Sequence, residues 1–104
     1  MKNTKQPSAE ARRFLERLSE PLTFRSWIRA IRLGEELSLA QFAERLGVSR
    51  TYLCSIEQGR RRPSVKRAAE WGRLLGYGEA QFVRLVLQDE LDAAKVKLRV
   101  SVAA

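Results

Sequence analysis

Basic side chains are concentrated in one short stretch of the sequence. Between residues 50 and 67 there is a single acidic side chain, Glu57, and there are six basic ones: Arg50, Arg60, Arg61, Arg62, Lys66 and Arg67. Guanidinium and ammonium groups spaced this closely favour a polyanionic partner, because they supply positive charge on one local surface. The alternative is a charged face that contacts only solvent. We therefore expect this stretch to be a candidate nucleic-acid contact.

The residue types on which most enzyme chemistry depends are missing. The chain has no histidine and one cysteine, Cys54, so the commonest zinc ligands, proton relays and disulfides are not expected. The acids Asp89, Glu90 and Asp92 resemble a metal cluster only superficially, because neighbouring helical positions point in different directions. Cys54 has no resolving partner, which favours a surface residue over a redox sensor. We expect a protein that is not an enzyme and that uses no metal and no cofactor.

Length and charge set the scale of the protein. A chain of 104 residues with 44% hydrophobic and 31% charged residues is typical of one soluble domain with a small core. The net charge of +8 is concentrated in residues 23–77, which hold eleven basic and five acidic side chains, whereas residues 78–104 hold four of each. Since no apolar run could span a bilayer and no signal peptide is evident, we expect a cytoplasmic protein without a membrane association.

The elements that would position these residues are helices. Apolar side chains recur at helical spacing, and serine N-caps and terminal glycines mark the helix boundaries. The expected helical ranges are 8–20, 24–34, 39–46, 49–58, 64–75 and 78–94. The helices 39–46 and 49–58 are joined only by Gly47-Val48-Ser49, which is the spacing of a helix-turn-helix.

The end of the chain has a different period. From Lys95 to Val102 polar and apolar residues alternate, with one apolar face formed by Val96, Leu98, Val100 and Val102. Strict alternation predicts a half-buried β-strand. Because a lone strand has unpaired backbone groups, we expect it to pair with the same strand of a second copy and so form a homodimer. The alternative is a tail without regular structure.

The segment from Arg32 to Ser64 resembles the DNA-binding domain of phage repressor/Cro-type helix-turn-helix regulators, the XRE family. The resemblance rests on Ala43, Gly47, Val48-Ser49, Ile56-Glu57, Gly59 and Pro63-Ser64, and it extends over about residues 24–76. It implies an all-α, five-helix repressor-like domain, to which this chain adds an N-terminal helix and the C-terminal β-strand. We expect an N-terminal extension (1–22), a DNA-binding domain (23–77) and a dimerisation segment (78–104).

The helix 49–58 has the dimensions and the two faces that the major groove requires. The groove is about 12 Å wide and admits one α-helix. Leu53 and Ile56 point inward, and the opposite face holds Arg50, Thr51, Cys54, Ser55 and Gln58. We expect Arg50, Thr51 and Ser55 to read bases, since an arginine can bond guanine O6 and N7 and a hydroxyl can donate or accept.

Other side chains are expected to contact the DNA backbone or to support the helix. The resemblance implies sugar-phosphate contacts for Gln58, Arg60, Arg61 and Arg62, and we place Ser49 and Tyr52 on the flank, although Tyr52 could equally be buried. It also implies a structural salt bridge between Arg32 and Glu57. The family usually has glutamine where this chain has Leu39, so a side-chain phosphate contact is missing there. Gln41 lies about 200° away around the helix and cannot replace it.

Two functions from different classes fit these features. The first is a sequence-specific regulator of transcription that binds double-stranded DNA as a homodimer on an inverted repeat and acts as a repressor. The second is an antitoxin or anti-activator whose residues 78–104 bind a partner protein, while its helix-turn-helix serves autoregulation. Binding of single-stranded RNA is disfavoured, because the sequence offers no array of exposed aromatic residues.

Overall fold

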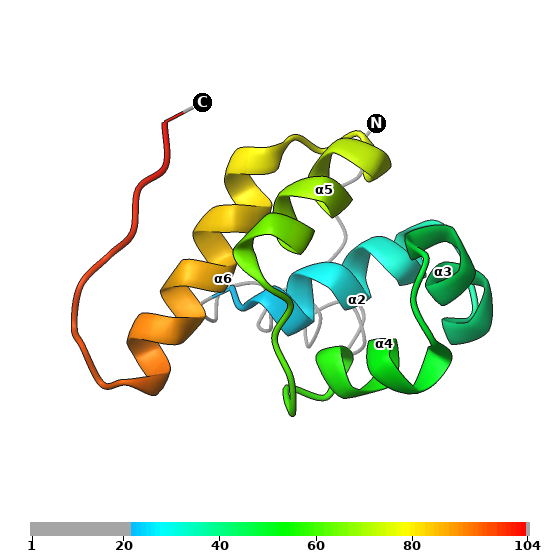
Figure 1. Cartoon of the computed structure of the whole chain (residues 1–104), viewed down its shortest axis with the longest axis horizontal. Helices are drawn as coiled ribbons and strands as arrows, with labels where there is room; N and C mark the ends of the chain where they lie inside the picture. The colour runs from blue at the N-terminus through cyan, green and yellow to red at the C-terminus, as the bar shows by residue number, and fades with distance from the viewer. Residues whose placement is uncertain (1–21, 104) are drawn as a thin grey trace, which may run out of the picture.

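The computed structural model describes residues 22–103 and contains five helices in that range (Figure 1). They are α2 (Phe24–Gly34), α3 (Leu39–Leu46), α4 (Arg50–Glu57), α5 (Val65–Leu75) and α6 (Glu79–Ala93). The helix expected over residues 8–20 lies outside the described residues. The five helices match the expected all-helical part of the fold, and their bounds agree with the sequence pattern to within about two residues.

The helix α2 begins at a doubly satisfied N-terminus. The side chain of Thr23 accepts a hydrogen bond from the backbone N–H of Ser26, and the Ser26 hydroxyl accepts one from the Thr23 N–H at 3.1 Å. A second acceptor comes from a distant part of the chain, because the Asp89 carboxylate on α6 accepts from the Phe24 N–H at 3.0 Å. This bond fixes the start of α2 against α6.

The connection between α3 and α4 is short because each end of it has its own cap. Gly47 adopts a left-handed conformation (φ 74°), which ends α3 at low cost in a residue without Cβ. Ser49 then caps α4 by accepting from the Tyr52 N–H at 3.0 Å. At the other end of α3, Ser38 and Gln41 form a reciprocal capping box. The turn between the two helices is therefore specified by local chemistry.

A single core joins all five helices. Aromatic rings connect α2 to both α5 and α6, since Phe24 lies 6.3 Å from Trp71 and 6.0 Å from Phe82 between ring centroids. The buried apolar side chains are Phe24, Ile28, Ile31, Phe42, Ala43, Leu46, Leu53, Ile56, Ala68, Trp71, Leu75, Phe82, Leu85 and Val86. The helix α6 thus packs in the same core as the helix-turn-helix.

The helices α5 and α6 approach each other most closely at a glycine. A Cβ atom built on Gly72 would lie only 2.3 Å from the carbonyl oxygen of Gly78, immediately before α6. No other residue type fits there without a shift of backbone. Gly72 therefore sets how tightly α6 folds back on α5.

The predicted C-terminal β-strand is wrong: within residues 22–103 no segment forms a strand. Residues 95–103 instead run back alongside α6 as an irregular segment, which we call the C-terminal segment (Figure 1). A strand needs a neighbouring strand to satisfy its backbone groups, and the helices provide none. The amide of Gln88 substitutes in part, because it donates to the Leu98 carbonyl and accepts from the Val100 N–H, both at 2.9 Å.

Candidate nucleic-acid interface

The helix α4 presents a polar face to solvent and an apolar face to the core. Leu53 and Ile56 are buried at 0% and 1% exposure, whereas Arg50 and Thr51 are exposed and Ser55 is half-buried. These three polar residues, which we expected to read bases, therefore come from the face that does not pack on the protein. The arrangement leaves them accessible to a groove of nucleic acid.

A row of polar contacts continues along α4 to the loop that follows it. Cys54 is half-buried, and its Sγ accepts a hydrogen bond from Gln58 Nε2 at 3.4 Å. Gln58 Oε1 in turn accepts from the guanidinium of Arg60. Ser49, at the other end, uses its hydroxyl to cap the helix. Gln58 and Arg60 remain exposed, so both are available for contact with a phosphate backbone.

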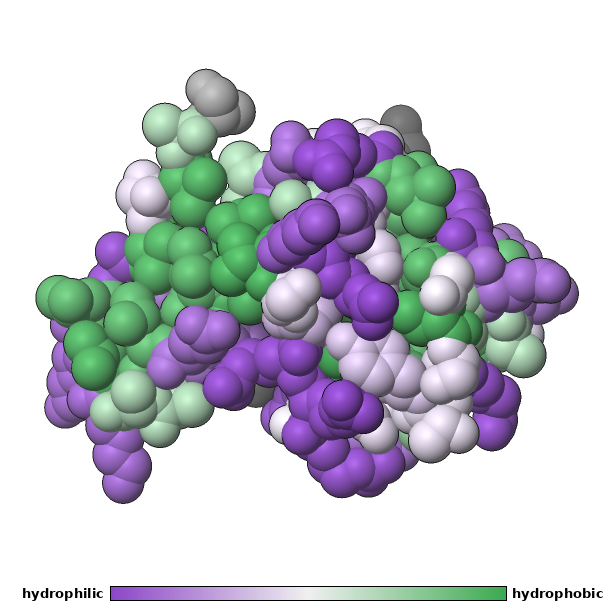
Figure 2. Space-filling model, in the orientation of Figure 1, coloured by the Kyte–Doolittle hydropathy of each residue, from purple (hydrophilic) through white to green (hydrophobic). Residues whose placement is uncertain are grey.

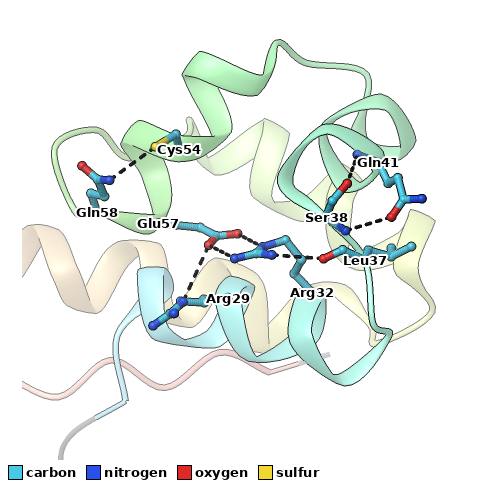
Figure 3. A network of polar contacts seen from close by, with 8 residues as sticks. All are labelled: Arg29, Arg32, Leu37, Ser38, Gln41, Cys54, Glu57 and Gln58. Carbon is cyan, nitrogen blue, oxygen red and sulfur yellow. Dashed lines mark hydrogen bonds and ion pairs between the residues drawn. The ribbon is translucent and has the colours of Figure 1, made fainter.

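Glu57 fixes α4 to α2 through a nearly buried ion pair (Figure 3). Arg32 Nε lies 2.8 Å from Glu57 Oε2, and Arg32 Nη2 lies 3.0 Å from Oε1, which is a bidentate arrangement. The Glu57 and Arg32 side chains are only 6% and 12% exposed. The hydrogen bond to Glu57 raises the pKa of Arg32, and this outweighs the opposing effect of burial. Arg32 also donates to the Leu37 carbonyl at 3.0 Å, so it ties together three segments.

The C-terminal end of α4 is held by a residue that the sequence pattern did not single out. Arg25 Nη1 donates to the Gln58 carbonyl at 3.3 Å, and the Arg25 side chain packs over Gly59. A Cβ on Gly59 would lie 2.7 Å from Arg25 Nη1, and Gly59 already has a positive φ of 78°. In the sequence, Arg25 is indistinguishable from Arg29, the other exposed arginine of α2. Only the packing of α2 against α4 shows its role.

Arg60, Arg61 and Arg62 form an exposed basic loop between α4 and α5. Within residues 22–103 none of the three is in an ion pair. A cleft of about 220 Å³ opens beside the loop, and its lining includes the basic residues Arg25, Arg61 and Arg62 and the acids Asp89 and Asp92. Burial raises the pKa of Asp89, although the bond from the Phe24 N–H and the charges of Arg62 and Arg25 lower it in part. The loop is thus positively charged and free to meet an anion.

Tyr52 lies on the flank of α4, half-buried, and packs partly on the core. The guanidinium of Arg61 lies over its ring at 4.9 Å from the centroid, and that of Arg67 lies over it at 5.3 Å. Arg67 belongs to the basic stretch expected to contact nucleic acid, but no individual contact was assigned to it. The sequence places Arg67 in the basic stretch, but it does not show that α5 brings Arg67 next to α4.

Leu39 stands where the family usually has a glutamine, and its side chain makes an apolar contact instead. Leu39 is half-buried and packs against the core. Gln41, the nearest amide, is engaged locally, because its Oε1 accepts from the Ser38 N–H at 2.9 Å (Figure 3). The Gln41 side-chain oxygen is thus used within the capping box of α3.

Residues 28–82, more than half of the chain, match a family model described as helix-turn-helix. The chain belongs to this family of XRE/Cro-type regulators and is therefore a DNA-binding regulator of transcription. No curated protein and no solved structure matches the chain. In the described part, no helix is both long enough and apolar enough to cross a membrane, and residues 22–103 contain no group of three acidic or cysteine side chains that could hold a metal ion.

Proposed function

We propose that this protein binds a specific operator sequence in double-stranded DNA with α4 in the major groove. In this proposal Arg50, Thr51 and Ser55 read base edges, while Ser49, Tyr52, Gln58 and the basic loop of Arg60, Arg61 and Arg62 contact the flank or the phosphates. The observation that supports it best is the outward polar face of α4 on a helix whose C-terminal end is held to α2 twice, by Glu57 to Arg32 and by Gln58 to Arg25. A helix fixed in this way can enter the major groove without a change in its orientation relative to the rest of the domain.

We further propose that the protein acts as a homodimer and represses transcription by occupying an inverted repeat. Val96 and Leu98 expose 38% and 63% of their surface, and Val100 and Val102 are half-buried beside them. Hydrophobic side chains gather on the side of the molecule formed by the C-terminal segment and α6 (Figure 2). This side lies away from α3 and α4 (Figure 1), so association there leaves both copies of α4 accessible. The paired helices would then meet half-sites about 34 to 36 Å apart, or a multiple of that.

Two measurements on one sample test this proposal. Footprinting on the protein's own promoter should show protection of two symmetric half-sites spaced by whole helical turns. Sedimentation should give a dimer that Leu98→Asp converts to a monomer, whereas Lys97→Asp, an adjacent exposed change, leaves it a dimer. An unsymmetric single site, or a monomer in the wild type, would contradict the dimeric repressor.

The exposed apolar side chains of the C-terminal segment also suit a second candidate, in which a partner protein binds residues 78–104 and DNA binding serves autoregulation. The two candidates differ in the state of the isolated protein. A dimer that forms without any partner favours the repressor. A monomer that binds the product of an adjacent gene through Val96 and Leu98 favours the antitoxin or anti-activator.

A further inference from the structure

We propose that Tyr52 is a positioning residue that holds Arg61 and Arg67 as a two-guanidinium clamp for one DNA phosphate beside α4. The inference rests on the proposed placement of α4 in the major groove. It adds Arg67 to the interface and assigns Tyr52 an indirect role, in which the ring acts through the two arginines.

The clamp is built from three separate parts of the chain. Tyr52 comes from the first turn of α4, Arg61 from the loop after α4, and Arg67 from the first turn of α5. The two guanidinium carbons lie 4.9 and 5.3 Å from the centre of the same ring. Because Tyr52 packs partly on the core, its ring is anchored, and both guanidinium groups lie over this anchored ring.

The positive charges of Arg61 and Arg67 favour the binding of an anion beside Tyr52. Neither Arg61 nor Arg67 is in an ion pair with any acid of residues 22–103, and both are exposed. Two guanidinium groups held near one ring repel each other, and the ring offsets only part of that repulsion. A phosphate placed between them would satisfy both, with the bidentate hydrogen bonds that arginine forms with phosphate oxygens.

Holding the arginines in advance matters because a free arginine loses rotamer freedom when it binds. That loss weakens binding by about two- to twelvefold for each long side chain ordered at an interface. A ring that orders Arg61 and Arg67 before binding removes part of this cost. Since phosphates carry no sequence information, the contribution of the clamp should be the same on every duplex.

The test compares binding to the promoter duplex and to a scrambled duplex by fluorescence anisotropy, over a series of salt concentrations. Tyr52→Leu should weaken binding to both duplexes by the same factor, about five- to thirtyfold, because Arg61 and Arg67 lose the ring that orders them and must be ordered when DNA binds. Arg67→Gln should lower the slope of log affinity against log salt by about one. The double variant Tyr52→Leu/Arg67→Gln should be less than additive, because both changes act on one clamp.

Two variants provide matched controls. Tyr52→Phe keeps the ring and loses only the hydroxyl, so it should weaken binding much less than Tyr52→Leu does and should keep the wild-type salt slope. Arg73→Gln removes one positive charge from the C-terminal end of α5, the helix that also holds Arg67. Because Arg73 pairs with Glu79 there, this change should alter the salt slope less than Arg67→Gln does. The clamp is overturned if Tyr52→Phe is as weak as Tyr52→Leu, if the double variant is additive, or if Arg67→Gln leaves the slope unchanged.

The test of the clamp remains decisive in two cases: an unfolded Tyr52→Leu variant, and a wild-type protein that does not prefer the promoter. If circular dichroism shows Tyr52→Leu to be unfolded, Arg61→Gln and Arg67→Gln still decide the matter, since an unchanged salt slope in both overturns the clamp. If the wild type does not prefer the promoter, the proposed operator function fails, but the effect of Arg67→Gln on the scrambled duplex still supports or overturns the clamp.

Discussion

Single residues decide whether α4 is held at a fixed angle to the rest of the protein. Arg32 and Glu57 lie on different helices, and their bidentate pair is largely removed from water. An ion pair in such a place contributes little net stability when intact, but the loss of one partner leaves an uncompensated charge. The pair therefore couples the position of α4 to the folding of the whole domain.

Removal of the Glu57 carboxylate should destabilise the fold before any DNA is added. We expect Glu57→Ala to lower the free energy of unfolding by about 3 kcal/mol, because Arg32 is left buried without its partner. Urea denaturation followed by circular dichroism measures this. Glu44→Ala, an exposed acid on α3, is the control and should lie within about 0.5 kcal/mol of the wild type. Equal stability of the two variants would contradict the structural role of the pair.

Asp89 should make stability depend on pH in a direction fixed by its environment. Burial raises the pKa of Asp89 in the folded protein, so the folded state favours the neutral carboxyl. Its contribution is fully present below the ordinary aspartate pKa of about 3.9 and is lost as the pH rises through the higher folded value. Asp89→Asn keeps an acceptor for the Phe24 N–H and cannot ionise.

We therefore expect wild-type stability to fall relative to that of Asp89→Asn as the pH rises from about 3 to 7. Unfolding free energies of both proteins at matched pH values provide the comparison. A difference that stays constant with pH, or that changes in favour of the wild type, would show that ionised Asp89 is not disfavoured in the fold.

The helix boundaries could be predicted from the sequence wherever they depend on residues that are neighbours in the chain. Ser38, Ser49 and Ser64 were expected as N-caps and each accepts the expected bond. The short turn at Gly47 followed from the same local chemistry. What failed was the strand at residues 95–102, because alternation describes side chains but does not supply a neighbouring strand. The contacts of Arg25, Arg67 and Gln88 were also missed, since each depends on how two distant elements pack.

Gly72 should be essential for the packing of α5 on α6. We expect Gly72→Ala to destabilise the protein by about 2 to 3 kcal/mol, because the new methyl group would overlap the Gly78 carbonyl oxygen. Gly34→Ala is the matched control, since a Cβ there would meet nothing within 4 Å. It should be neutral or stabilising, as alanine is in most helical positions. Thermal denaturation of both variants settles the comparison, and a Gly72→Ala protein as stable as Gly34→Ala would contradict the close approach.

The amide of Gln88 should hold the C-terminal segment to α6. We expect Gln88→Ala to speed hydrogen exchange at the Val100 N–H, which loses its acceptor. The amide of the neighbouring Ser101, which makes no hydrogen bond to the Gln88 side chain, serves as the internal reference and should change much less. Exchange measured by NMR at both positions tests this, and equal rates at Val100 in the two proteins would rule out the bond as a restraint.

At the scale of the whole molecule, charge and hydrophobicity are separated. The basic loop and the polar face of α4 lie at one side, and the exposed apolar side chains of the C-terminal segment lie at another (Figures 1 and 2). The excess of positive charge in residues 23–77 was readable from the sequence, because it depends on composition alone. The separation depends on the fold, which brings Arg61 and Arg67 together and turns the C-terminal segment back along α6.

Direct reading of bases by α4 depends most on Arg50, so a substitution of Arg50 tests it. Binding of the wild type, Arg50→Ala and Arg73→Ala should be measured on the promoter duplex and on a scrambled duplex at one fixed salt concentration. We expect Arg50→Ala to lose about 1 to 3 kcal/mol of the preference for the promoter, and Arg73→Ala to keep that preference. If Arg50→Ala weakens both duplexes equally, or neither, then Arg50 contacts only the phosphate backbone or no DNA at all, and base reading by α4 is contradicted.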